Sequence, residues 1–149
     1  MVEVCPRCRS KEVSAEFQGV LVAGWNRILD ILRQIGEGTI CALDGIEISL
    51  LDDREMAEVH GEFLDDATPT DVITFEYGEL LIGVETAERQ AGEFGTRPDH
   101  EIALYGIHGM LHLSGFDDRE PADAERMAER QEELFREVFG EVMAKKQFF

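Results

Sequence analysis

The amino-acid sequence predicts one α+β domain over residues 1–149, with a single small mixed sheet covered by helices. Its length is that of one ordinary domain and allows a substantial core to be buried. Short segments rich in β-branched residues alternate with longer segments whose apolar residues recur at helical spacing. Taken in order, these segments read as βαβαββααα, which is typical of one short sheet with helices packed on it.

The first half of the chain is expected to form two strands separated by a long helix. Residues 2–8 form a strand that Pro6 places at a sheet edge, with a frayed terminus as the alternative. Apolar residues at helical spacing across 19–35 predict a core-packing helix, in which Trp25 is a core residue rather than a base-stacking platform. Residues 45–51 alternate and then become uniformly apolar, which predicts a strand.

The second half is expected to be mainly helical. A helix over 54–64 follows the second strand, with Asp52 or Asp53 as its N-terminal cap. The strands 72–75 and 79–84 are joined by a short hairpin-like link. Three more helices are expected: one over residues 85–94, one that begins at Pro98 and ends near Ser114 and Gly115, and one over residues 122–144.

Two histidines, His108 and His112, lie four residues apart in an apolar helical segment. In a helix this spacing puts both imidazoles on one face, within reach of one metal ion, although such pairs also occur in cores and on surfaces. Gly115 stands where a helix ends in a left-handed residue, so the chain can return Asp117 or Asp118 to the same ion. Two imidazoles and one carboxylate leave a fourth coordination position open, as in catalytic zinc sites.

The spacing of this motif equals that of the metzincin string HExxHxxGxxH, with two changes. Gly109 replaces the glutamate that acts as general base, and Asp118 replaces the third histidine. The missing glutamate argues against ordinary peptidase chemistry, since nothing in the motif can deprotonate an attacking water. His60 is a further possible ligand, although a histidine on a helix surface is the favoured interpretation.

Three sequence blocks resemble the YbeY family, the bacterial metallo-endoribonucleases of ribosomal RNA maturation. The block 108–118, HGMLHLSGFDD, is similar to the family signature HGxLHLxGYDH. The block 69–75, PTDVITF, resembles PTDVLSF, and the block 79–91, ELLIGVETAERQA, resembles a GDIVIS strand followed by a helix. The three blocks occur in the family's order and run through most of the chain.

This resemblance implies both a fold and an activity. The metal helix is expected to lie across the sheet beside the strand 72–75, in a zincin-like arrangement. Asp118 aligns with the family's third histidine, so the implied ligands of one Zn²⁺ per chain are His108, His112 and Asp118. The implied activity is metal-dependent endonuclease hydrolysis of single-stranded ribosomal RNA during ribosome biogenesis.

Four other positions bear on the substrate cleft. Thr70 and Asp71 are expected to border it, although a loop-capping role is slightly favoured for Asp71. Asp117 is either a partner that orients a ligand imidazole or a solvated turn residue. The family has an arginine five residues before the proline of its PTD block, where this chain has Leu64. A phosphate clamp is therefore missing at that position.

The negative charge is concentrated around the metal motif. The chain has a net charge of −18, and residues 37–118 contain three Lys or Arg against twenty Asp or Glu. This is unusual for a nuclease, because nucleic-acid binding draws much of its affinity from the neutralisation of phosphates. Either Arg7, Arg9 and Lys11 contact RNA together with the metal, or a basic partner such as a ribosomal protein carries the RNA.

Two alternatives to the nuclease stay open at this stage. The first is a non-catalytic ribosome-assembly factor whose metal is structural, which the acidity and Leu64 favour. The second is a metallohydrolase of another class, such as a peptidase. The Cys5 and Cys8 pair does not support a zinc ribbon, since no second pair exists. The chain starts without an apolar signal-peptide core and contains no bilayer-length apolar run, so we expect a cytoplasmic protein without membrane contact.

Overall fold

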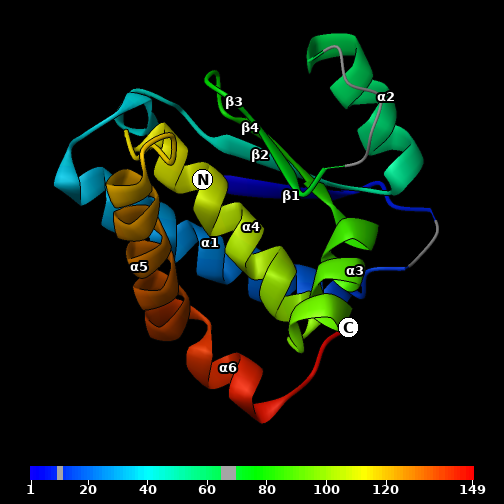
Figure 1. Ribbon diagram of the computed structural model, residues 1–149. Helices are drawn as coiled ribbons and strands as arrows, with labels where there is room; N and C mark the ends of the chain where they lie inside the picture. Colours follow the sequence, from blue (N-terminus) through cyan, green and yellow to red (C-terminus); the bar gives the residue numbers. More distant parts are fainter. Residues whose placement is uncertain (10–11, 65–69) are drawn as a thin grey trace.

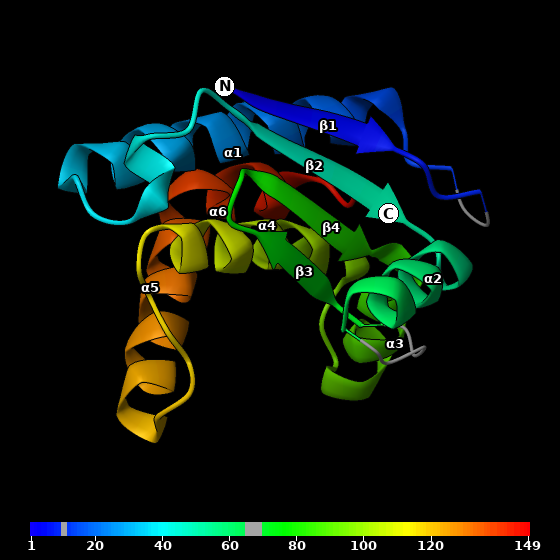
Figure 2. The same ribbon diagram turned by 90° about the horizontal axis from the view of Figure 1, so that it is seen from above.

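The computed structural model describes residues 1–9, 12–64 and 70–149, whose helices pack on one four-stranded sheet (Figure 1; Figure 2). The predicted α+β class with a small mixed sheet is confirmed. The strands are β1 (Val2–Pro6), β2 (Ile46–Leu51), β3 (Val72–Phe75) and β4 (Glu79–Gly83). The helices are α1 (Ala15–Ile35), α2 (Asp53–Leu64), α3 (Val84–Phe94), α4 (Pro98–Leu113), α5 (Pro121–Val138) and α6 (Gly140–Lys145), with a 3-10 helix at Thr39–Cys41. Within these ranges, no helix has both the length and the apolar character needed to cross a bilayer.

The sheet has the strand order β1-β2-β4-β3. Its first three strands are parallel, and β3 pairs antiparallel with β4 at the opposite edge. Pro6 therefore lies on an edge strand, as predicted, where its missing N–H leaves no gap in a central ladder. The edge strand β3 matters most for function, because its free side borders the pocket that contains the histidine pair.

One face of the sheet carries the main hydrophobic core. Alternate residues of β2 and β4, including Ile48, Leu50, Leu80 and Ile82, are fully buried in this core. The helices α1, α4, α5 and α6 supply most of the rest, and the figures show them together on this side of the sheet (Figure 1; Figure 2). Val84 and Ala87 of α3 also belong to this core. The alternate buried residues of the strands and the apolar side of α1 thus belong to one apolar layer.

Two glycines let α4 pack closely between α1 and the sheet. Trp25 of α1 is fully buried, as predicted, and its indole Nε1 donates a hydrogen bond to the carbonyl of Ala103 at 3.2 Å. A Cβ atom on Gly106 would lie 2.3 Å from the Trp25 ring, and one on Gly109 would lie 2.4 Å from Leu80 Cδ2. These approaches hold α4 across the sheet beside β3 and β4, as the zincin-like expectation required.

On the opposite face of the sheet, the described residues form a small cluster under α2. Its buried residues are Leu51, Met56, Ile73 and Leu81. Beside this cluster, Glu3, Glu47 and Glu79 stand in register on three neighbouring strands. Unpaired carboxylates are costly to bury, and Glu3 and Glu47 are exposed.

The beginning of α4 is tied to the C-terminal segment. The Asp99 carboxylate is fully buried, pairs with Arg97 at 2.6 Å and accepts a hydrogen bond from the Phe148 N–H at 2.9 Å. The Arg97 guanidinium also donates to the carbonyls of Met143 and Lys146, both at 2.8 Å. A buried charge needs such paired and hydrogen-bonded partners, so these contacts fix the start of the helix.

The end of α4 is held by the 3-10 segment. The Thr39 hydroxyl donates to the Leu113 carbonyl at 3.3 Å. The backbone at Gly38 approaches so closely that a Cβ atom there would lie 2.3 Å from the same carbonyl oxygen. The helix is therefore restrained at both ends.

The single C-terminal helix expected over 122–144 is wrong in one respect, because it is broken between α5 and α6. The fully buried Phe139 ring occupies the space beside Gly24 of α1, where a Cβ atom would lie 2.2 Å from the ring. Gly140, a poor helix former, follows it. The bend seats Phe139 in the core and directs α6 towards Arg97.

Candidate metal centre

The turn after α4 places a carboxylate opposite the two histidines. The helix ends at Leu113, and Gly115 adopts a left-handed φ of 95°. The N–H of Phe116 then bonds back to the carbonyl of Leu111 at 3.0 Å. This closing pattern reverses the direction of the chain. Asp118 therefore lies beside the face of α4 that carries the two histidines.

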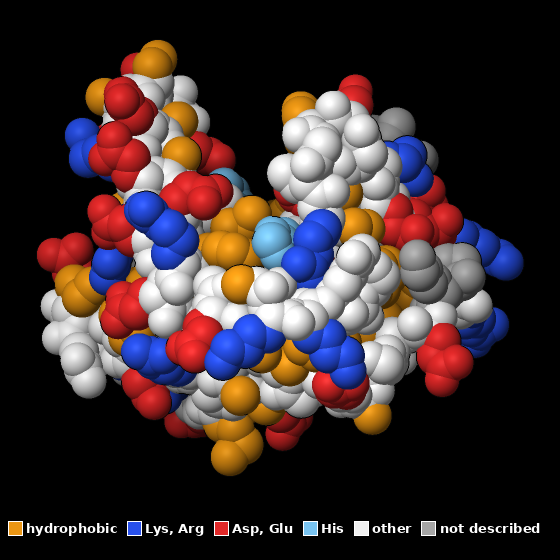
Figure 3. All heavy atoms as spheres, turned by 90° about the horizontal axis from the view of Figure 1, so that it is seen from below, with side chains coloured by type: hydrophobic (Ala, Val, Ile, Leu, Met, Phe, Trp, Pro, Cys, Tyr) orange, Lys and Arg blue, Asp and Glu red, His pale blue; other side chains and the backbone are white. Residues whose placement is uncertain are grey.

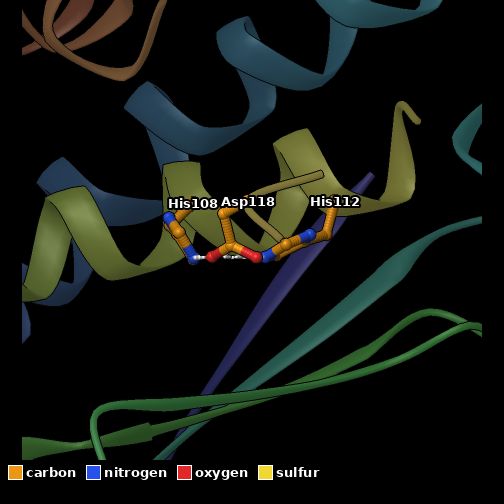
Figure 4. Close-up of side chains that lie close together, drawn as sticks. All are labelled: His108, His112 and Asp118. Atoms are coloured by element: carbon orange, nitrogen blue, oxygen red, sulfur yellow. Dashed lines mark hydrogen bonds and ion pairs between the residues drawn. The ribbon is translucent and has the colours of Figure 1, made fainter. Parts of the chain in front are cut away.

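The three residues that the sequence predicts as ligands come together around one point (Figure 4). The two Nε2 atoms of His108 and His112 are 3.2 Å apart. Asp118 Oδ2 lies 3.6 Å from His108 Nε2 and 3.7 Å from His112 Nε2. Ligands about 2.0–2.2 Å from a tetrahedral ion are separated from one another by about 3.3–3.6 Å. The spacing therefore fits three ligands of one small divalent ion.

The hydrogen bonds of the rings set the direction of their lone pairs. His112 Nδ1 lies 3.1 Å from the Phe116 carbonyl, which can only accept, so Nδ1 carries the proton. His108 Nδ1 lies 2.9 Å from Gln131 Oε1 of α5, which assigns the same tautomer. In this tautomer, both Nε2 atoms present lone pairs to each other and to Asp118, an arrangement that a cation would stabilise. Gln131 and Phe116 are partners that sequence reasoning missed.

The group lies in a pocket of about 850 Å³ between the edge strand β3 and the end of α4. Its wall opposite the histidines is formed by residues 70–76, and His60 of α2 lies at its rim. Among the described residues, the cluster that can hold a metal consists of His108, His112 and Asp118, so His60 is outside it. The pocket is large enough for a substrate group beside an ion.

The charges lining the pocket are mostly negative. Its acidic residues are Asp71, Glu76, Asp117 and Asp118. Arg119 is the one Lys or Arg lining it among the described residues, and its side chain pairs with Asp117 at 3.7 Å. On the face seen from below, Lys and Arg side chains are interspersed with Asp and Glu, and histidine lies in a hollow (Figure 3). A divalent ion would offset part of this negative potential.

The other predicted cleft residues have defined places. Thr70 and Asp71 line the pocket, and the Asp71 carboxylate also accepts a hydrogen bond from the Val72 N–H at 2.7 Å, the favoured capping role. Asp117 accepts from the Arg119 N–H at 3.1 Å, while Gln131 and Phe116 occupy the partner positions of the two imidazoles. Leu64 ends α2, and its side chain lies outside what the structure describes, as do Pro69 and Lys11.

Gly109 separates this centre from a metallopeptidase. A Cβ atom there would lie 2.4 Å from Leu80 Cδ2 and 3.0 Å from the Thr74 hydroxyl oxygen. A side chain at this position would therefore require Leu80 to shift away from α4. In the packing observed, the position of the general-base glutamate of the peptidase motif is taken by a residue without a side chain.

A helix with paired histidines, a returning carboxylate and an edge strand beside them define a small metallohydrolase-like α+β protein. Residues 23–139 match the model of the family described as Endoribonuclease YbeY. An Endoribonuclease YbeY of Petrotoga mobilis is 32% identical over 116 residues, covering 72% of this chain and 78% of that protein. One of Myxococcus xanthus is 37% identical over 110 residues, which are 64% of this chain and 37% of that protein.

A solved structure agrees with these sequence matches. The solution structure of TM1509 from Thermotoga maritima superposes with a TM-score of 0.71 and 26% identity, covering 97% of this chain and 93% of the other. The chain belongs to the YbeY family. The family resemblance of its three sequence blocks is thereby confirmed.

Proposed function

We propose that this chain is a metal-dependent endoribonuclease that cleaves single-stranded RNA during ribosomal RNA maturation, with one Zn²⁺ held by His108, His112 and Asp118. Membership of the endoribonuclease family supports its class, a hydrolase acting on RNA phosphodiester bonds. The single observation that carries the metal centre is the triangle of ligand atoms with sides of 3.2, 3.6 and 3.7 Å. Imidazole ligands favour zinc, copper, iron or nickel over magnesium.

The chain's own residues prepare the site for this chemistry. When bound, a divalent ion there would lower the pKa of water to about 7 and polarise a phosphoryl oxygen. Gln131 and the Phe116 carbonyl hold the two rings in the tautomer that such an ion requires. Arg119, which lines the pocket and pairs with Asp117, would supply one positive charge near a phosphate of the substrate. Thr70 and Asp71 form the facing wall, where a substrate strand would pass.

The proposed partner is the ribosomal subunit or its RNA, and the proposed location is the cytoplasm, where ribosomes are assembled. The acidic pocket supports a second candidate, an assembly factor that binds a basic ribosomal protein and whose metal is structural. The two candidates differ in whether the metal is needed for cleavage.

Four variants test the proposal. Purified protein reconstituted with zinc is assayed by elemental analysis and by cleavage of a labelled single-stranded RNA. Asp118→Ala should lose most of its metal and activity, and His108→Ala should lose both. Asp117→Ala should lose at most about 10–100-fold in metal affinity, the cost of removing a hydrogen-bonded partner of a ligand, because Asp117 bonds to the Arg119 N–H and not to an imidazole. Asp118→His should keep the metal.

Two outcomes would count against the nuclease. Cleavage that persists after chelation and in His108→Ala would come from a contaminant. Metal bound in full, without any cleavage of single-stranded or ribosomal RNA, would favour the assembly factor.

A further inference from the structure

Three aromatic rings form a continuous row beside the metal pocket. The ring of Phe75 stacks on that of Tyr77 with centroids 5.5 Å apart and planes 19° apart. The Phe63 ring of α2 meets Phe75 edge-on, also at 5.5 Å. Phe75, in the middle, is half-buried, whereas the terminal rings are open: Phe63 is 59% exposed and Tyr77 is 69% exposed.

The row is continuous with the metal pocket. Phe75 and Glu76 line the same pocket as His108 and Asp118. Side chains alternate along β3, so that Thr74 points towards α4 and Phe75 packs on the opposite side, beside the α2 cluster. A chain that leaves the metal centre around the free edge of β3 would meet Phe75, which lines the pocket, before Tyr77, which does not.

Contiguous exposed apolar surface marks interaction sites on proteins, whereas single exposed apolar side chains are common and need no such role. Phosphate contacts cannot supply much affinity here, because four carboxylates line the pocket and Arg119 is its single cation within the described ranges. Stacking on aromatic faces needs no positive charge and tolerates any base, because every base has a π face. Unpaired bases, unlike paired ones, can be splayed out to reach such rings.

We propose that Phe63, Phe75 and Tyr77 form a platform on which unpaired bases of single-stranded RNA stack beside the metal centre. This inference rests on the proposed function and specifies how its substrate is recognised. Bases bind on the platform, and the phosphate of the nucleotide at its pocket end reaches the metal ligands. Binding then depends less steeply on salt than in nucleases that grip phosphates with several Lys or Arg residues.

The experiment measures RNA binding by fluorescence anisotropy with metal-stripped protein, so that the readout does not depend on cleavage. The probe is a labelled oligoadenylate, compared with an abasic oligomer that has the same length and phosphates. Tyr77→Ala and Phe63→Ala should each weaken oligoadenylate binding by about 5- to 150-fold and leave abasic binding unchanged. Tyr77→Phe keeps the ring and loses only the hydrogen bond to Glu79, so it should bind like the wild type.

Phe94→Ala is the matched control, since Phe94 is 68% exposed at the end of α3 and does not line the pocket. It should leave RNA binding unchanged. The proposal is overturned if Tyr77→Ala and Phe63→Ala bind RNA as Phe94→Ala does, or if the abasic oligomer binds wild-type protein equally well. The same variants are also measured with a labelled arginine-rich peptide. The proposal is overturned if Tyr77→Ala and Phe63→Ala weaken binding of this peptide but not of RNA, because the rings would then bind a protein partner.

A separate cleavage assay distinguishes this proposal from the proposed function. If zinc-loaded wild type fails to cleave RNA but the binding differences hold, the platform stands and the nuclease fails. If wild type cleaves and the two alanine variants have unchanged KM, the platform fails and the nuclease stands.

Discussion

The two faces of the sheet differ in how completely helices cover them. On the inner face, α1 and α4 bury every inward residue of β2 and β4 in one core. On the outer face, α2 covers a cluster of four buried residues, and Glu3 and Glu47 on the neighbouring strands are exposed. The comparison teaches that the inner face supplies the stability of the fold. The outer face and the adjoining edge of β3 leave room for a ligand.

The largest loss of stability is expected for a large buried side chain in the core on the inner face. Trp25→Ala removes a fully buried indole and its hydrogen bond to Ala103. The free energy of unfolding should fall by about 3–5 kcal/mol, as for other buried aromatic truncations. Urea denaturation followed by circular dichroism measures this change. A loss below about 1 kcal/mol would show that the core collapses around the cavity.

The outer cluster should respond less to the same kind of truncation. Met56→Ala creates a cavity in a cluster whose helix touches the sheet at few points, so the surroundings can relax. We expect the free energy of unfolding to fall by about 2 kcal/mol, the lower end for buried methionine. Equal losses for Met56→Ala and Trp25→Ala would remove the proposed asymmetry between the faces.

A third prediction concerns the contact between α4 and the sheet. Gly109→Ala forces a methyl group against Leu80, which should cost about 1–3 kcal/mol and lower RNA cleavage by shifting the metal helix. Gly92→Ala is the matched control, because nothing lies within 4 Å of an added Cβ there. That variant should gain about 0.4–1 kcal/mol. A neutral Gly109→Ala would mean that the Leu80 side chain can move aside.

The smallest effect is a pH dependence on the inner face. Burial lowers the pKa of His100 below its ordinary value, against the opposing pull of Asp99, Glu101 and Glu132. The unfolded chain then binds a proton on this residue at a higher pH than the folded chain does. This contribution to stability is present above about pH 6.5 and is lost as the pH falls towards the folded pKa.

The variant His100→Asn removes this contribution. Urea midpoints of wild type and variant, measured at neutral and mildly acidic pH, should differ in their decline, with the steeper loss in the wild type. Identical declines would show that His100 does not contribute to the acid sensitivity of the fold.

Sequence reasoning was most successful where the signal is local. The spacing of His108 and His112, and the left-handed position of Gly115, depend only on helix geometry and need no knowledge of the rest of the fold. Helical periodicity likewise predicted α1 and its buried Trp25, although the helix begins earlier, at Ala15, because Ser14 caps Phe17.

The features that were missed depend on contacts between distant segments. Gln131 lies 23 residues from His108 and meets it only because α5 packs beside α4. The break at Phe139 arises because that ring fits beside Gly24, which no pattern within 122–144 reveals. The aromatic row is similar, since Phe63 reaches Phe75 only after α2 folds over the outer face. Periodicity describes each element, and tertiary packing decides which elements meet.

The restraint of α4 at both ends has a consequence for ion selection. Arg97 and Asp99 hold its first turn, and Thr39 holds its last, so the imidazole nitrogens cannot easily move apart. The conformational entropy of the helix that carries these side chains is lost during folding and not on metal binding, so metal binding has a smaller entropic cost. Such a fixed pair is poorly matched to calcium, which takes six to eight oxygen ligands at about 2.3–2.6 Å. The fixed spacing of the two imidazoles thus favours a small ion that takes nitrogen ligands.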